Sequence, residues 1–246
     1  MEKKIFIGTS GYNYQHWKNI FYPKNLTPQK WLEFYTQHFN SVELNVTFYR
    51  LPQSTAFSSW YKRSPTSFRF VIKGSRFITH IKRLKECQKP LKLFFKRASN
   101  LKEKLVCILW QLPPSLKCDL TRLEKFIKLL KGWPQYMYSF EFRNQTWFNG
   151  NTYQLFENNN INLCIANSPS FPCYEVITSN FLYLRFHGGK ILYGSEYSSK
   201  ELRKWGQKTR KWLKNSPTLF AFFNNDAYGF AIKDALTFRE LISERV

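Results

Sequence analysis

The chain has 246 residues, of which 38 are Lys or Arg and 16 are Asp or Glu, so its formal net charge is +22. Hydrophobic residues make up 43% of the chain and aromatic residues 19%, which excludes an intrinsically disordered protein. Only 10 residues are glycine, which excludes collagen-like and low-complexity architectures. The positive charge invites a nucleic-acid partner, although AT-rich codon usage would produce part of the same lysine surplus.

The compartment is indicated by the amino-terminal residues and the cysteines. The first apolar stretch runs directly into Gly8-Thr9-Ser10-Gly11 and is too short for the hydrophobic region of a signal peptide. No apolar window reaches the roughly 18 residues of a membrane span, so we expect no membrane partner. The five cysteines are odd in number and include no CxxC pair, which indicates reduced thiols. We therefore expect a cytoplasmic protein.

Short apolar runs alternate with helix-like segments along the whole chain. Helical spacing or capping residues mark segments that begin at Thr27-Pro28, at Leu120-Thr121 and at Ser198. Strands that alternate with helices imply a parallel sheet, and eight such units predict an α/β fold, a single (β/α)8 (TIM) barrel domain over residues 1–246. The expected strands cover residues 4–9, 41–45, 69–74, 105–112, 137–143, 162–167, 182–187 and 218–225.

Polar side chains gather at the expected strand ends, where barrels of this class carry their chemistry. Residues two apart in a strand share a face, so the polar residues that alternate with apolar ones point together into the barrel. A buried charge costs several kcal/mol unless it is paired, so opposite charges are expected to meet there, either as a site or as a structural network that closes the barrel. The expected members are Glu43, Glu141, Asp226, Lys73, Arg143 and Arg185.

The candidate catalytic residues are those able to transfer a proton. A carboxyl group in a partly closed pocket can have its pKa raised towards neutrality, and the imidazole of histidine has an ordinary pKa of about 6.5. The alternative is that each carboxylate is the fixed partner of a cation, and that the histidine is neutral and hydrogen-bonded. We assign catalysis to Glu43, Glu141, His187 and Asp226.

The candidate substrate-binding residues suit an anion, because arginine presents a planar fork to phosphate or carboxylate. Gly188-Gly189 follows the seventh strand, where many barrels bind phosphate on backbone amides. Aromatic residues at the mouth could stack on a ring, although such residues more often pack in a core. The candidates are Tyr12, Asn45, Tyr49, Lys73, His80, Arg143, Arg185, Asn224 and Asn225, whereas His16 and His38 look like surface or packing positions.

Oxygen and nitrogen ligands at the same strand ends would suit manganese, magnesium or zinc. The neighbouring cations disfavour a metal ion, and no metal-ligand spacing supports one, so we assign no metal ligand. No motif assigns a cofactor or an oligomeric state, and both stay open.

Motifs occur in collinear order along essentially the whole chain. They include Gly8-Thr9-Ser10-Gly11-Tyr12, residues 39–49, Gln111-Leu112-Pro113-Pro114, Glu141-Phe142-Arg143, Arg185-Phe186-His187-Gly188 and Phe223-Asn224-Asn225-Asp226. This set resembles the YecE-like family, domain of unknown function 72, and implies a TIM barrel with a site at these strand ends but no particular reaction. Members of that family usually carry aspartate where this chain has Asn167, so an activity that needs the carboxylate would be impaired here.

Two functions fit these features. The first is an enzyme that acts on an anionic, phosphate-bearing substrate, a nucleic-acid phosphodiester being one candidate, by hydrolase or lyase chemistry at the barrel mouth. The second is a non-catalytic nucleic-acid-binding or regulatory protein. It would use the basic segment 62–104, which holds 14 Lys and Arg and only two Glu. Phenylalanines interleaved with these cations suit single-strand binding, although they are also typical of the core face of a strand or a helix.

Overall fold

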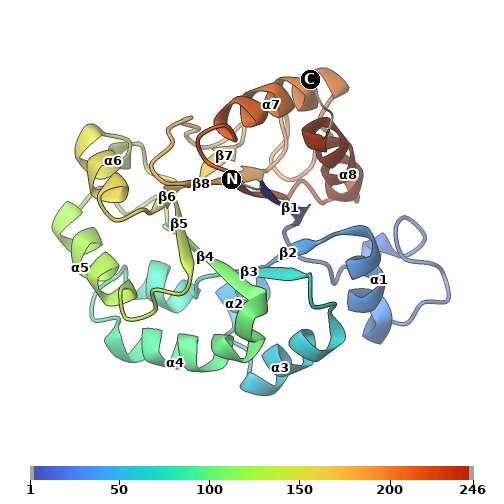
Figure 1. Ribbon diagram of the computed structural model, residues 1–246, viewed down its shortest axis with the longest axis horizontal. Helices are drawn as coiled ribbons and strands as arrows, with labels where there is room; N and C mark the ends of the chain where they lie inside the picture. Colours follow the sequence, from blue (N-terminus) through green and yellow to red (C-terminus); the bar gives the residue numbers. More distant parts are fainter. Residues whose placement is uncertain (1–2, 244–246) are drawn as a thin grey trace.

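The computed structural model describes residues 3–243, with strands at the centre and helices around them (Figure 1). Most of the expected strands are present within two residues of their expected ends, and the sixth is divided in two. The strands are β1 (Lys4–Thr9), β2 (Ser41–Leu44), β3 (Arg69–Lys73), β4 (Leu105–Gln111), β5 (Met137–Glu141), β6 (Asn162–Leu163), β7 (Ile165–Asn167), β8 (Phe181–Phe186) and β9 (Thr218–Phe223).

The helices follow the strands in the order that a barrel requires. They are α1 (Trp31–His38), α2 (Val46–Tyr49), α3 (Ser54–Arg63), α4 (Gln88–Ala98), α5 (Leu120–Leu130), α6 (Gly150–Glu157), α7 (Ser199–Trp212) and α8 (Phe230–Ser243). Helices α5 and α7 begin where expected, whereas Pro28 opens a 3-10 turn (Pro28–Lys30) that leads into α1. Ser198, for example, caps α7 in a capping box with Glu201, because each side chain accepts a backbone hydrogen bond of the other residue.

All strand pairs are parallel, in two ladders with the orders β1-β9-β8-β7 and β2-β3-β4-β5-β6. Only Cys164 separates β6 from β7, and its backbone N–H donates to the carbonyl of Phe140 in β5 (2.8 Å), so residues 162–167 connect the ladders as one strand. At the other junction, a parallel bridge between Ser10 and Glu43 links the end of β1 to β2. The expected (β/α)8 barrel is confirmed.

The alternation of side chains along the strands divides the buried residues into two apolar layers. Phe70 and Ile72 of β3 belong to the layer between the strands and the helices. Val71, between them in sequence, belongs to a smaller cluster inside the barrel, together with Leu109 of β4 and Phe222 of β9. The next inward-facing positions towards the strand ends are polar, so the period-two pattern of each strand places the site above this inner cluster.

Two further expectations concern the chain as a whole. The single domain over residues 1–246 stays a prediction, and residues 1–2 and 244–246 lie outside the part of the chain that the structure describes. Within residues 3–243, no helix combines the length and the apolar character needed to cross a membrane.

Candidate functional site

Arg185 of β8 is the centre of the charged cluster in the barrel. It is 1% exposed, and its guanidinium group binds carboxylates from two other strands. Nη2 lies 2.6 Å from Oε1 of Glu43 in β2, and Nη1 lies 2.6 Å from Oε2 of Glu141 in β5. These contacts tie three strands together at the end where they open into loops.

Each of the two carboxylates has further partners. Tyr183 donates its hydroxyl hydrogen to Oε2 of Glu43 (2.6 Å), and Ser10 donates to Oε1 (2.7 Å). Arg143 pairs with Oε1 of Glu141. We call Glu43, Arg185, Glu141 and Arg143 the ion-pair chain; it contains two negative and two positive groups, so opposite charges are matched inside the barrel.

The ion-pair chain changes the role expected of Glu141. Burial alone would raise the pKa of this carboxyl group, but the charges of Arg143 and Arg185 outweigh burial and hold its pKa well below the ordinary range. The expectation of a pKa raised towards neutrality is therefore wrong for Glu141. At neutral pH this side chain is an ionised partner of two arginines and has no proton to donate.

His187 follows β8 and is fully buried beside the ion-pair chain. Burial, reinforced by the charge of Arg185, lowers the pKa of its ring to about 4, although Glu141 acts in the opposite direction. Asn224 donates its amide hydrogen to Nδ1 (3.1 Å), and Nε2 lies 3.5 Å from Nη1 of Arg185 and 3.8 Å from Oε2 of Glu141. Phe171 packs edge-on against the same ring. His187 is thus a neutral imidazole at physiological pH.

This environment predicts how His187 affects stability with pH. Between the ordinary pKa of about 6.5 and the folded value of about 4, only the unfolded chain takes up a proton at this position. The stabilising contribution is therefore present above pH 6.5 and is lost as the pH falls, by at most about 1.4 kcal/mol per pH unit. Urea denaturation at a series of pH values from 7 to 4 measures how the free energy of unfolding depends on pH. We expect His187→Gln to remove the part of this dependence that comes from the histidine. The same pH dependence of the free energy of unfolding in wild type and His187→Gln would contradict a buried neutral imidazole.

Lys73 ends β3 and is the cation of the cluster that has no carboxylate partner within residues 3–243. It is 8% exposed, and its Nζ lies 4.1 Å from the centre of the Phe48 ring. Burial, followed by the charge of Arg185, lowers the pKa of this amine to about 7. His80 packs edge-on against the same Phe48 ring, and burial followed by the charge of Lys73 lowers the pKa of His80 to about 4. Lys73 and His80 thus contact the same aromatic side chain.

Asp226 lies apart from the ion-pair chain, contrary to expectation. Trp17 donates its indole hydrogen to Oδ1 (2.7 Å), and Nε2 of His16 lies 3.0 Å from Oδ2. Burial raises the pKa of the Asp226 carboxyl group, while these two contacts lower it. The expected meeting of Asp226 with Lys73, Arg143 and Arg185 is wrong, because the loop after β1 supplies nearer partners. His16, which we expected to be a surface or packing residue, is one of them.

Several other expected binding residues have structural partners. Asn225 donates to Oδ2 of Asp234 in α8 (2.6 Å) and to the carbonyl of Ser195, which fixes the loop after β9. Tyr12 packs against Tyr35 in the apolar layer behind the strands. Asn45 donates to the carbonyl of Ser10, while its buried Oδ1 has no partner among the described residues. Tyr49, in contrast, is 78% exposed.

The segment after β8 is also occupied by internal hydrogen bonds. The backbone N–H of Gly188 donates to the hydroxyl of Tyr197 (3.0 Å), which in turn donates to Oδ1 of Asn167 (2.7 Å). The expected phosphate site on the Gly188-Gly189 amides therefore lacks the free Gly188 amide. Asn167 serves here as the acceptor that orients Tyr197.

Sequence reasoning missed three contributors to the cluster. Tyr183 is two residues from Arg185, so the period of the strand already placed both side chains on one face. Ser10 lies directly after β1, within the Gly8-Thr9-Ser10-Gly11 motif. Phe171 has no such signal: it comes from the loop before β8, and only the fold brings its ring within 3.4 Å of the Arg143 guanidinium carbon.

The cluster offers few donors to a metal ion. The carboxylates of Glu43 and Glu141 are bound by arginine, tyrosine and serine side chains. Within residues 3–243 there is no group of three or more His, Cys, Asp or Glu residues arranged to hold a metal. The arrangement offers a substrate three groups: the neutral imidazole of His187, the amine of Lys73 that has no carboxylate partner among the described residues, and the free edge of the Arg143 guanidinium group.

Comparison with known proteins identifies the family. The sequence profile described as "Protein of unknown function DUF72" matches residues 6–246. The chain belongs to the DUF72 family. Among its relatives, the UPF0759 protein YunF of Bacillus subtilis is 24% identical over 97% of this chain and 94% of its own length. The UPF0759 protein YecE of Escherichia coli K12 is 26% identical over 88% of this chain and 85% of its own length.

A solved DUF72 structure has the same fold. The crystal structure of a DUF72 family protein from Thermotoga maritima aligns with a TM-score of 0.87 and 28% identity, covering 98% of this chain and 100% of that one. The resemblance to the YecE-like family is thereby confirmed. Like the family's description, these relatives' names state no reaction.

Proposed function

We propose that this DUF72 protein is an enzyme that acts on a small, phosphate-bearing anionic substrate at the C-terminal mouth of the barrel. The observation that carries the proposal is Lys73. A buried ammonium group costs free energy unless an anion accompanies it, and the carboxylates nearby are already held by arginines. An anionic ligand over Lys73 and the free edge of Arg143 would satisfy both groups.

The same residues supply hydrolase or lyase chemistry. An amine whose pKa is about 7 is present in both protonation states near neutral pH, as a general acid or base requires. In hydrolysis its ammonium form, which also pairs with the anion, would donate a proton to the leaving oxygen while water attacks phosphorus and releases its own proton to solvent. In a lyase reaction its free-base form would accept a proton from a substrate carbon as phosphate leaves from the neighbouring carbon. His187 and His80, both neutral, would hydrogen-bond the substrate, while Glu43 and Glu141 would position the arginines.

Anion binding tests the first half of this proposal. Sulfate is the probe of choice because its charge stays constant near neutral pH, and calorimetry measures its affinity. We expect binding to weaken as the pH rises through about 7, where Lys73 loses its charge. Lys73→Met should weaken binding at least tenfold and abolish the pH dependence, whereas Lys200→Met, at an exposed position of α7, should change neither. Equal binding by wild type and Lys73→Met would contradict the proposal.

Turnover tests the second half. Phosphorus NMR of a mixture of sugar phosphates and nucleotides detects both hydrolysis and elimination, because each changes the environment of the phosphorus atom. We expect the wild type to convert at least one component, and Lys73→Met, purified identically, to convert none. A rate that is the same in both proteins would assign the activity to a contaminant and contradict a catalytic Lys73.

The cysteines support a cytoplasmic location for this enzyme. All five are free thiols, and Cys87, Cys107 and Cys164 are buried. Free thiols are typical of a reducing compartment. The alternative function, a nucleic-acid-binding protein that uses the basic segment 62–104, is favoured by a separate, positively charged surface to which this segment contributes Lys82, Arg83 and Lys85.

A further inference from the structure

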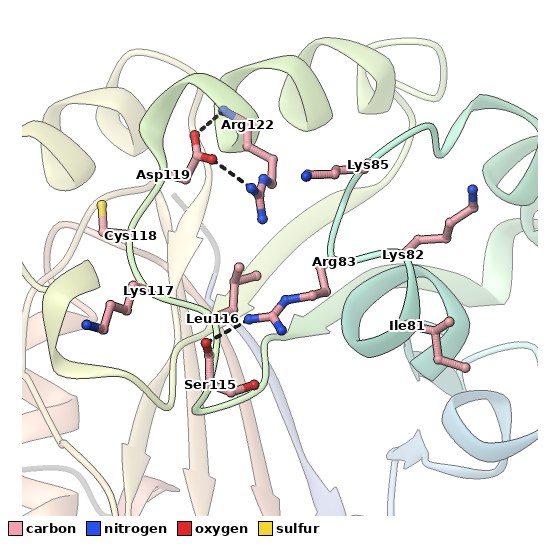
Figure 2. A pocket seen from close by; sticks show the side chains of 10 residues that line it. All are labelled: Ile81, Lys82, Arg83, Lys85, Ser115, Leu116, Lys117, Cys118, Asp119 and Arg122. Carbon is pink, nitrogen blue, oxygen red and sulfur yellow. Dashed lines mark hydrogen bonds and ion pairs between the residues drawn. The ribbon is translucent and has the colours of Figure 1, made fainter.

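Three adjoining cavities lie along the loops that follow β3 and β4 and between helices α4 and α5. Their volumes are about 690, 1300 and 470 Å³. The first two share Lys82, Lys85 and Arg122, and the last two share Phe77 and Lys89, so they form one continuous surface feature. We call it the α4–α5 groove. Figure 2 shows its first part, between the loop that carries Arg83 and the start of α5.

The charge of the α4–α5 groove is strongly positive. Nine Lys or Arg residues line it, against two carboxylates, Glu86 and Asp119. Both carboxylates already have partners, because Asp119 pairs with Arg122 (3.0 Å) and Glu86 with Lys82 (3.1 Å). Most of the other cations, Lys85 among them, have no carboxylate partner within residues 3–243. Figure 2 shows the side chains of Lys85 and Arg122 pointing towards the same space.

Exposed apolar side chains lie among these cations. A π-helical turn at Phe77–Ile81 buries Ile78 but leaves Phe77 46% and Ile81 61% exposed. Tyr49, at the end of α2, is 78% exposed and lines the same stretch of the groove as Phe77. Aromatic faces set in a positively charged groove are what single-stranded nucleic acid requires, since unpaired bases stack on the rings while phosphates contact the cations.

The loop between these cations is held in an unusual conformation. Arg83, Leu84 and Glu86 all have positive φ angles (50°, 65° and 50°), a region that residues other than glycine rarely adopt. The conformation is maintained because Leu84 is buried and Arg83 donates to the carbonyl of Ser115 (2.7 Å). Strain of this kind persists at sites whose side chains must be held in place.

We infer that the α4–α5 groove binds single-stranded nucleic acid, with its phosphates on the groove lysines and arginines and its bases on Phe77 and Tyr49. This inference goes beyond the proposed enzyme, because the α4–α5 groove is distinct from the ion-pair chain. Binding of nucleic acid in the groove requires no catalytic step at the ion-pair chain. A duplex fits less well, since its bases are stacked on each other and cannot cover the exposed rings.

The test is fluorescence anisotropy with a labelled oligo(dT) of about 15 nucleotides, a length that spans a typical single-strand site. We expect binding that weakens steeply with salt, and tighter binding of oligo(dT) than of a duplex of the same length. Phe77→Ala should weaken binding about tenfold without changing net charge, because one stacking contact is lost. Lys85→Glu/Lys125→Glu should weaken it at least tenfold.

The matched control is Lys204→Glu/Lys211→Glu, two exposed positions on α7, on the far side of the ring of helices from α4 (Figure 1). It changes the net charge by the same amount and should leave most of the affinity intact. Equal losses in both double variants, no loss in Phe77→Ala, or equal affinity for duplex and oligo(dT) would each overturn the inference, since each indicates attraction by net charge alone. Sulfate binding at Lys73 should be unchanged in all these variants, so the two proposals can fail separately.

Discussion

Arg185→Met is expected to lower the free energy of unfolding by about 3–5 kcal/mol at pH 7, as measured by urea denaturation. The substitution leaves Glu43 buried with only the hydroxyls of Ser10 and Tyr183 as partners, and leaves Glu141 with Arg143 as its one cation. A buried carboxylate that has lost its cation in a medium of low dielectric constant is more costly than the loss of the ion pair itself.

Two comparisons separate this effect from a general loss of packing. Arg63→Met breaks an ion pair with Glu33 in which both side chains are one-third exposed, and it should cost less than about 1 kcal/mol. Adding Glu43→Gln and Glu141→Gln to Arg185→Met should recover part of the stability, because the amides carry no charge. If Arg185→Met costs no more than Arg63→Met, the ion-pair chain is not a buried network.

Gly8→Ala is expected to lower the free energy of unfolding by about 3 kcal/mol, the upper end of the range for a methyl group forced into a packed core. A Cβ atom at this position of β1 would lie far closer than van der Waals contact to the carbonyl oxygen of Ser41 in β2, and it would also meet the Tyr35 hydroxyl. The first of these is a backbone atom, so no side-chain rotation relieves the clash. The strands most affected are the pair joined by the Ser10–Glu43 bridge.

Gly150→Ala is the control for this substitution. Gly150 begins α6, and nothing lies within 4 Å of the place where its Cβ would be. Alanine there should leave the stability unchanged or raise it by up to about 1 kcal/mol, because it restricts the unfolded chain. A similar result for Gly8→Ala and Gly150→Ala would contradict close contact between β1 and β2.

The strands and the inward-facing residues could be predicted from the sequence because both follow from local patterns. Glu43, Glu141 and Arg185 each stand two residues from another polar side chain and next to apolar ones, and a strand turns such a pattern into two faces. The surplus of lysine and arginine in residues 62–104 was equally visible. The α4–α5 groove was not, because only part of that surplus lines it and the rest of its cations come from a separate segment, α5 and the loop before it. The groove takes Arg76, Lys82, Arg83, Lys85 and Lys89 from the basic segment and Lys117, Arg122, Lys125 and Lys128 from outside it.

The partners of each charge depended on distances across the barrel. Glu141 ends β5 and Asp226 lies in the loop that follows β9, and the sequence alone favoured the same role for both. The fold gives Glu141 two arginines and gives Asp226 a tryptophan and a histidine from the loop after β1. Their pKa values consequently move in opposite directions, down for Glu141 and up for Asp226. No periodic pattern reports such contacts, because residues from a loop have no fixed direction.

Length, alternating apolar runs and strand-end residues were sufficient by themselves to predict a TIM barrel with a polar mouth, because the period of a strand fixes which side chains share a face. The collinear motifs added the resemblance to the DUF72 family. The net charge of +22 was equally a property of the sequence. Only the tertiary structure decided which charges cancel and which remain free. Arg185 is neutralised inside the barrel, Lys73 stays unpaired at its mouth, and Lys85 faces an open groove, because pairing depends on distances between segments that lie far apart in the chain.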